Sequence, residues 1–320
     1  MDYYGYDVEC GDQMIIHEAL TYLESRMDLS QFDSDDNGYI DAIVLINTLD
    51  IDADVTMKWA YRYWNIYEDN SGNFYEYDGV SANDYLWAGY KFLLEEYTST
   101  GDTVYNDNNM NTYTFIHEFG HVLGADDYYD TAYVSEPLEG CDIMDSMLGD
   151  HNAFTKFNLG WITTSRLVVA SDSVTLTLED FSKNGDTIVI ANNWDATLGA
   201  YQEYYIVVYY KNTGLNGGDA GYFVNDGIVV YHVNASLYSE EIDGEVYYDI
   251  YYNNTDASDS YGTPENLIEF AYAPNGNIVH TQGTTSSKTT QDDSGNIISY
   301  YFTVDSITSD FATITFTKNN

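Results

Sequence analysis

The chain has 320 residues, of which 44 % are hydrophobic, so it is long enough for one large or two modest folded domains and is not a disordered sequence. Its 53 acidic and 10 basic residues give a formal net charge of −43. Such a charge repels nucleic acid and anionic membrane surfaces, so we expect no nucleic-acid partner. Since no stretch approaches about 20 consecutive apolar residues, we also expect no membrane span.

The first predicted elements are an amphipathic helix over 13–27 and an acidic, glycine-containing loop after it. The loop places oxygen-bearing groups as in the first part of an EF-hand, and its candidate Ca²⁺ ligands are Asp33, Asp35, Asn37, the carbonyl of Tyr39, and Asp41. The bidentate Glu that closes an EF-hand is replaced by Val44, and an apolar strand over 42–46 is expected where an EF-hand has a helix. We therefore expect a structural Ca²⁺ turn that enters a strand. The alternative is an acidic turn in which Gly38 supplies a positive φ and no ion binds.

Two aromatic-rich stretches, 55–67 and 85–94, are expected to form core strands. The residues between Glu95 and Asn111 are polar and predict a loop. This loop would lead into the segment that carries the chain's main cluster of metal-ligand residues.

That segment, 111–130, reads NTYTFIHEFGHVLGADDYYD. At about 100° per residue on a helix, His117, Glu118 and His121 share one side and an apolar stripe covers the other. Two imidazoles one turn apart can bind a single Zn²⁺, while Glu118 beside them can take a proton from a metal-bound water without being a ligand. We expect Gly124 to end the helix in a left-handed conformation.

The turn after Gly124 brings three carboxylates within reach of the same ion, those of Asp126, Asp127 and Asp130. A catalytic zinc site needs three protein ligands and one open position, which two histidines and one of these aspartates supply. Peptide-bond hydrolysis suits this set, with Glu118 acting as base and then as acid toward the leaving amine. The alternative is a chance HExxH match on a buried helix.

Beyond this segment, residues 154–161 predict a short helix with a glycine stop, and the pattern then changes to period 2. The alternating stretches predict strands at 174–178, 187–191, 204–210, 228–233, 298–304 and 311–316. The predicted fold class is α+β. We expect a catalytic domain over 1–166, followed by an antiparallel β-rich, sandwich-like region over 167–320 that packs on it.

The stretches HEFGHVLGADDYYD and CDIMDSMLGDHNAFTKFNLGW fit the pattern HExxHxxGxxD with a later methionine-containing turn. On these residues the chain resembles the immune inhibitor A-like secreted bacterial zinc metallopeptidases, which are metzincin-like. The resemblance runs from about residue 30 to about residue 235 and includes the weaker matches EYYIVVYYK and GIVVYHVN. It implies His117, His121 and Asp127 as zinc ligands, Glu118 as general base, and Met144 as the methionine of a turn beneath the metal.

The chain departs from that family at Ala125-Asp126, where Leu-Pro often stands, and this leaves the choice between Asp126 and Asp127 open. The resemblance further implies a protein or peptide substrate and an extracellular or cell-surface location, although the first residues contain no visible signal peptide. Tyr128 and Tyr129 are candidates for stabilising the oxyanion.

The alternative function is a catalytically silent, calcium-stabilised surface binding protein on a metallopeptidase scaffold. The presence of Glu118 favours the enzyme, because a silent scaffold has no chemical need for the base. The sequence leaves open the cleavage specificity, the oligomeric state, and whether Cys10 and Cys141 form a disulfide or remain two thiols.

Overall fold

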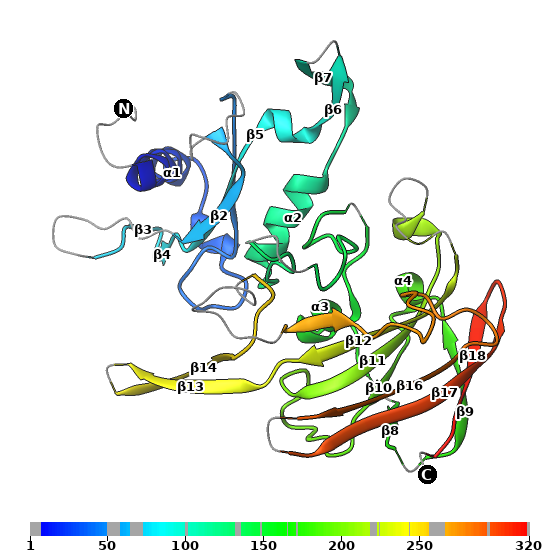
Figure 1. Cartoon of the computed structure of the whole chain (residues 1–320). Helices are drawn as coiled ribbons and strands as arrows, with labels where there is room; N and C mark the ends of the chain where they lie inside the picture. The colour runs from blue at the N-terminus through cyan, green and yellow to red at the C-terminus, as the bar shows by residue number, and fades with distance from the viewer. Residues whose placement is uncertain are drawn as a thin grey trace. The chain divides into compact units, whose positions relative to one another are not determined.

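The computed structural model divides into two compact units, residues 1–124 and 125–320 (Figure 1). It describes residues 8–49, 58–64, 73–99, 102–131, 136–147, 149–164, 166–170, 172–217, 223, 225–242, 244–255, 266–292 and 295–318. Helices are few and strands are many, mostly in antiparallel sheets, so the mixed, β-rich fold class is confirmed. The expected domain boundary after residue 166 falls inside the second unit and stays a prediction. None of the described helices is long and apolar enough to cross a membrane.

The first unit is built on a three-stranded sheet in which β5 lies between β1 and β2. Its strands are β1 (Ile43–Asn47), β2 (Tyr61–Trp64) and β5 (Asp84–Gly89). β5 runs parallel to β1 and antiparallel to β2. The expected strand over 42–46 is therefore confirmed as β1. Of the aromatic stretch 55–67, residues 55–57 and 65–67 lie outside the described residues, and β2 occupies its middle.

The sheet is covered on both faces because successive side chains of β5 point in opposite directions. Tyr85 and Trp87 belong to one buried cluster with apolar residues of α1 (Val8–Glu24). Leu86 and Ala88 belong to another, which contains three apolar side chains of α2 (Tyr113–Val122). The helix predicted over 13–27 is confirmed as α1, and α2 is the predicted helix of the metal-ligand segment.

The sequence predicts a loop over the polar run 95–111, and this prediction is wrong. These residues form most of a β-hairpin. The 3₁₀ helix η3 (Tyr90–Leu93) leads into β6 (Leu94–Ser99), which pairs antiparallel with β7 (Asp102–Met110). In a two-stranded ribbon the backbone hydrogen bonds hold the strands without an apolar face, and hydrophobic alternation therefore gives no signal for it. A second small hairpin joins β3 (Glu76–Tyr77) and β4 (Val80–Ser81).

The described part of the second unit contains two large sheets and a two-stranded one formed by a hairpin. The five-stranded sheet has the order β15-β12-β11-β10-β8, and the four-stranded sheet has the order β16-β17-β18-β9. All neighbours are antiparallel except β8 and β10. The strands are β8 (Leu167–Val168), β9 (Val174–Glu179), β10 (Thr187–Ile190), β11 (Glu203–Tyr210), β12 (Gly227–Asn234), β15 (Ile268–Phe270), β16 (Thr285–Gln291), β17 (Ile297–Ile307) and β18 (Phe311–Phe316).

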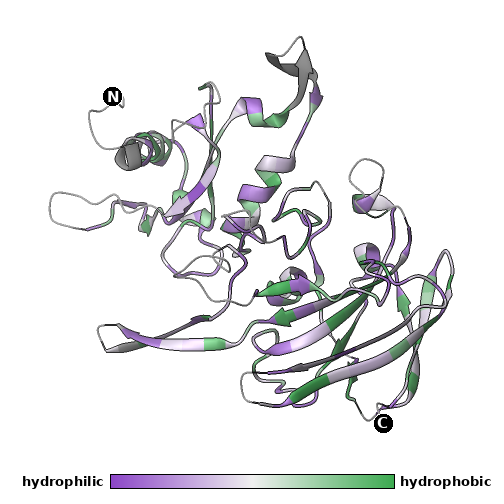
Figure 2. Ribbon diagram, viewed as in Figure 1, coloured by the Kyte–Doolittle hydropathy of each residue, from purple (hydrophilic) through white to green (hydrophobic). Residues whose placement is uncertain are grey.

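A single buried cluster takes side chains from both sheets of the second unit, which makes them a sandwich. Ile188, Val207 and Val230 enter it from the five-stranded sheet. Val304 and Ile314 enter it from the four-stranded sheet. Figure 2 shows hydrophobic residues along strands of both sheets. All six strands predicted from period-2 alternation are present.

Short elements complete the second unit. They are α3 (Ala153–Asn158), α4 (Phe181–Asn184), the 3₁₀ helix η4 (Gly214–Asn216), and the hairpin of β13 (Leu237–Ile242) with β14 (Glu245–Ile250). The side chain of Asn152 caps α3 by accepting a hydrogen bond from the backbone N–H of Thr155, with 2.9 Å between the atoms. Gly160 follows the helix at φ 71°, so the predicted helix with a glycine stop is confirmed.

Candidate metal centres

Helix α2 has defined ends that hold its two histidines in place. The side-chain oxygen of Asn111 accepts a hydrogen bond from the backbone N–H of Tyr113 at the first turn, at 3.0 Å. At the other end Gly124 has φ 95°, and its N–H donates to the carbonyl oxygen of His121 at 3.0 Å. The left-handed helix end predicted at Gly124 is confirmed.

The apolar stripe of α2 is narrower than the sequence suggests. Phe115, Phe119 and Val122 pack against the β5 cluster, whereas Ile116 and Leu123 are 41 % and 45 % exposed. These two residues lie at the edges of the stripe, where the helical rotation turns them away from the sheet. The packing of the other three fixes the rotation of the helix about its axis.

The chemical side of α2 is buried. The residues His117 and Glu118 are 8 % and 9 % exposed. The ring of His121 lies one turn further on, with its centroid 5.0 Å from that of His117 and its plane nearly perpendicular. Helical spacing thus places two imidazoles side by side with a carboxylate next to them.

Asp127 joins the two histidines. One ligand atom from each of His117, His121 and Asp127 can be chosen so that all three lie within 4.8 Å of one another. Asp126 is exposed and Asp130 is buried, and the group found among the described residues contains neither. Two imidazole nitrogens and one carboxylate oxygen are a donor set that fits Zn²⁺ with one position left open. This geometry favours Asp127 over its neighbours.

The carboxylate of Asp127 is oriented by Tyr129, two residues further along the chain. The hydroxyl of Tyr129 donates a hydrogen bond to Asp127 Oδ2 at 2.9 Å. The hydroxyl of Tyr128 is instead buried and lies 2.7 Å from Thr155 Oγ1, and burial raises the pKa of Tyr128. Of the two candidates for the oxyanion, Tyr128 is therefore directed into the interior, and Tyr129 holds a candidate metal ligand.

Met144 lies fully buried in a turn that one carboxylate holds together. Asp142 Oδ1 accepts a hydrogen bond from the backbone N–H of Met144, and Oδ2 accepts one from that of Asn152, each at 2.7 Å. Burial raises the pKa of Asp142 to about 7 even though both hydrogen bonds oppose the rise. The sequence analysis assigned no role to Asp142. The signal available was an acidic residue two positions before the turn methionine, where such side chains commonly bind the backbone.

The acidic loop 33–41 brings three of its carboxylates together. Ligand atoms of Asp33, Asp35 and Asp41 lie within 4.8 Å of one another. Asp33 accepts hydrogen bonds from the N–H groups of Asn37 and Gly38, at 3.0 and 2.9 Å, and Gly38 has φ 86°. Oxygen ligands converging in a tight turn are the arrangement that Ca²⁺ requires.

The loop is also attached to the first unit through the backbone. The N–H of Ile40 donates to the carbonyl oxygen of Ser81 in β4, and the N–H of Ser81 donates to that of Gly38, both at 2.9 Å. The side chain of Ile40 is buried in the cluster that contains Tyr85 and Trp87. A bound ion would therefore stabilise a turn that is continuous with the core of this unit.

Three further residues have side chains that can bind a metal or react, but their surroundings indicate a structural role. The ring of His151 packs edge-on against Trp161, with 5.2 Å between centroids. Cys141 carries a free thiol, whose pKa is raised by burial and by neighbouring carboxylates, so it is a weak nucleophile. His280 is buried on the inside of the second unit, and burial lowers its pKa to about 4, which keeps it neutral.

A charged group that the sequence analysis missed lies on the five-stranded sheet of the second unit. His232 Nε2 lies 2.9 Å from Glu203 Oε1, and His232 Nδ1 lies 3.3 Å from Glu269 Oε1. Burial lowers the pKa of His232, but the two carboxylates outweigh burial and raise it to about 9. The signal that could have revealed this group is the pairing of neighbouring strands. His232 on β12 lies opposite Tyr205 on β11 and Glu269 on β15. Glu203 is two residues before Tyr205 and therefore lies on the same face.

Comparisons with protein-family models, with curated proteins and with solved structures found no match. Function is therefore inferred from the geometry of the described residues. That geometry provides two groups able to hold a cation: a histidine–aspartate group beside a buried glutamate, and an all-oxygen group in an acidic turn. The first group has the donor types of a catalytic site, and the second has those of a structural one.

Proposed function

We propose that this protein is a secreted zinc-dependent endopeptidase that hydrolyses peptide bonds in protein or peptide substrates. The observation that carries the proposal is the convergence of His117, His121 and Asp127 ligand atoms, with the buried Glu118 directly after His117 on the same helix. A chance HExxH on a buried helix has no reason to bring a third ligand from beyond the helix end. The resemblance to the immune inhibitor A-like metallopeptidases, stated above from the sequence, points to the same chemistry.

In this proposal His117, His121 and Asp127 would hold the ion, and Tyr129 would fix the orientation of the Asp127 carboxylate through their hydrogen bond. Zn²⁺, when bound, supplies a Lewis acid and lowers the pKa of water in its open position. The three side chains leave that position for water and substrate.

Glu118 would be the general base and acid. It follows His117 directly on α2 and is only 9 % exposed, which supports a base that would work beside the ligand group in a setting of low water content. It would accept a proton from the attacking water as oxygen adds to the peptide carbonyl. It would then deliver a proton to the leaving nitrogen as the C–N bond breaks, so that an amine and a carboxylate are released.

Two parts of the fold would support this site. We propose that residues 1–166 include a metzincin-like catalytic domain, with the Asp142-held turn at Met144 as its methionine turn. We also propose that the loop 33–41 binds Ca²⁺ as a structural ion. An acidic, calcium-binding chain of this kind suits an extracellular location.

The test compares two neighbouring aspartates. We expect Asp127→Asn to lower zinc affinity and cleavage of an unstructured protein by at least about tenfold, because a ligand is lost. Asp126→Asn removes the same charge from the adjacent, exposed position and should leave both within about twofold. Equal effects of the two substitutions would contradict the proposed ligand set. If zinc binds and the folded native chain cleaves nothing in a peptide library, the alternative of a silent surface binding protein takes its place.

A further inference from the structure

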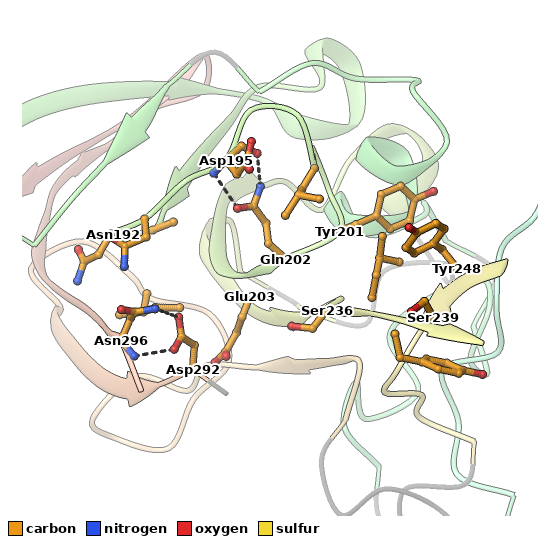
Figure 3. A pocket seen from close by; sticks show the side chains of 16 residues that line it. Asn192, Asp195, Tyr201, Gln202, Glu203, Ser236, Ser239, Tyr248, Asp292 and Asn296 are labelled. Atoms are coloured by element: carbon orange, nitrogen blue, oxygen red, sulfur yellow. Dashed lines mark hydrogen bonds between the residues drawn. The ribbon is translucent and has the colours of Figure 1, made fainter. Parts of the chain in front are cut away.

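A pocket with a cavity volume of about 480 Å³ lies in the second unit, formed by three segments that are far apart in the sequence (Figure 3). One segment is the connection 191–203 between β10 and β11. The second is the base of the β13–β14 hairpin, and the third is the turn between β16 and β17. The size of the cavity suits one amino-acid side chain or a small molecule.

Three of the amide side chains that line this pocket donate hydrogen bonds within the protein. Gln202 Nε2 donates to the carbonyl oxygens of Asp195 and Gly199, at 2.7 and 2.9 Å. Asn296 Nδ2 donates to Asp292 Oδ2 at 2.9 Å, and Asn192 Nδ2 donates to the carbonyl oxygen of Ile297. Figure 3 shows the Gln202 and Asn296 bonds as parts of the pocket wall. The amides thus stabilise the wall, and they contribute few donors to a ligand.

The acceptors of the pocket are carboxylates. Three carboxylates line the pocket, those of Asp195, Glu203 and Asp292, and the Glu203 side chain is only 6 % exposed. Its Oε1 atom is paired with His232 at 2.9 Å. The pair with His232 uses Oε1, which leaves Oε2 as the atom that an N–H donor of a ligand would reach.

The charges select a cation. The lining residues include three carboxylates and no lysine or arginine, and His232 behind Glu203 is already shared with Glu269. A metal ion is a poor match, because among the described residues no three carboxylate or histidine ligand atoms of this pocket lie within 4.8 Å of one another. The carboxylates are spread too widely for one small ion. They suit a larger organic cation with several N–H donors.

The rim of the pocket is apolar and aromatic. Tyr201 and Tyr248, which are 38 % and 71 % exposed, lie near each other at one end. Leu198 and Leu237 also line the pocket. Such a rim can cover the methylene stem of a long side chain while the charged head reaches the carboxylate floor. Aromatic faces also attract cations directly.

We propose that this pocket binds the guanidinium or ammonium side chain of a peptide, with Glu203 as the principal acceptor and the Tyr201–Tyr248 rim holding the aliphatic stem. This site is separate in its residues from the histidine–aspartate group, and the proposal does not rest on peptidase activity. It gives the β-sandwich unit a binding function of its own, the capture of basic segments of a peptide or protein.

The experiment measures binding of small probes to the full chain by calorimetry or ligand-observed NMR. The cationic probes are N-acetyl-arginine methylamide and N-acetyl-lysine methylamide. Their neutral counterparts are the citrulline and norleucine derivatives, which keep the shape and lose the charge. We expect at least one cationic probe to bind at least about tenfold more tightly than its counterpart. This comparison uses the native chain and needs no substitution.

Two variants locate the site. Glu203→Gln should weaken binding of the cationic probe at least about tenfold. Glu179→Gln removes the same charge from an exposed position on β9 outside the pocket, and it should change binding less than twofold, which separates pocket binding from attraction to a chain of net charge −43. If Glu203→Gln does not fold, Tyr248→Ala at the exposed rim should still weaken binding several-fold.

Three outcomes would overturn the proposal. They are the absence of probe binding to the native chain, equal binding of charged and neutral probes, and equal weakening by Glu203→Gln and Glu179→Gln. Binding of a neutral methyl glycoside without binding of either cation would show that the pocket takes saccharides. Because zinc is not needed for any of these measurements, failure here and failure of the peptidase proposal are distinguishable.

Discussion

The backbone N–H of Tyr128 donates a hydrogen bond to the carbonyl oxygen of Met144, with 2.9 Å between the two atoms. This bond joins the segment that carries Asp127 to the turn that Asp142 holds together. Both partners are buried, at 1 % and 0 % exposure. The position of the candidate third ligand therefore depends on a turn that follows it in the sequence by more than a dozen residues.

Replacing Asp142 with alanine should destabilise the protein by about 2–5 kcal/mol, because it leaves the buried N–H groups of Met144 and Asn152 without their acceptor. Asp142→Asn keeps one acceptor oxygen and should cost less. Urea denaturation at pH 7 measures both. A loss below about 1 kcal/mol for the alanine variant would show that the carboxylate does not hold the turn.

Replacing Tyr129 with phenylalanine should lower zinc affinity by about tenfold to a hundredfold while the fold is kept. The substitution removes the hydroxyl that donates to Asp127 Oδ2, and such supporting hydrogen bonds tune the ligand. The measurement is competition for zinc with a chelating dye. Tyr301→Phe on β17 removes an exposed hydroxyl and serves as the control. Equal zinc affinity in the two variants would contradict the supporting role.

Added Ca²⁺ should raise the melting temperature of the native chain, since a ligand that binds the folded state stabilises it by about 2.7 kcal/mol at a concentration 100 times its Kd. The gain should be reduced in Asp35→Asn and Asp41→Asn, which lose candidate ligands. Asp36→Asn provides the matched control, because it lies in the same loop outside the candidate ligand set, and asparagine tolerates its φ of 60°. A gain that Asp36→Asn removes as strongly as the others would argue for nonspecific binding.

The pair of Glu203 and His232 should make stability depend on pH. The pKa of His232 is about 9 in the folded chain against a usual value of 6.5, so the folded state binds the proton more tightly. The resulting stability is fully present below about pH 6.5 and is lost as the pH rises through about 9. We expect the native chain to lose on the order of 2 kcal/mol more than His232→Gln between pH 6 and pH 10. The measurement is urea denaturation at the two pH values. An equal change in the free energy of unfolding for the two proteins would contradict this prediction.

Local patterns predict much of the fold and of the candidate metal site. The three-four spacing in 117–121 fixes which side chains share one side of α2, and Gly124 marks the helix end because few other residues adopt a positive φ there. The period-2 alternation of β9 and β18 reflects one buried and one more exposed face, whereas β10, β11 and β12 are buried along almost their whole length and stand out as apolar runs. The strand β1 after the acidic loop can be predicted because its residues form an apolar run.

Features that depend on distant residues could not be predicted in this way. The hairpin β6–β7 is held by pairing between two polar segments, and side-chain polarity does not report such pairing. Which of Asp126 and Asp127 faces the two histidines depends on how the backbone turns after the helix. Two adjacent aspartates in the sequence do not reveal this. The pocket around Glu203 is formed by three segments that are far apart in the sequence. Its hydrogen-bond acceptors, and the amides that already donate within the protein, can be recognised only once the fold brings these segments together.

The most direct test of the central claim is to measure zinc content and cleavage of an unstructured protein in parallel for the native chain and Glu118→Gln. Glutamine keeps the size of the side chain and lacks the carboxylate base, so the ligand group is left intact. We predict about one zinc per chain in both proteins, with cleavage by the native chain and a loss of at least about a hundredfold in the variant. Glu76→Gln, at an exposed position of the same unit, should cleave like the native chain. Absence of zinc from the folded native chain, or equal cleavage by native and Glu118→Gln proteins, would contradict the account.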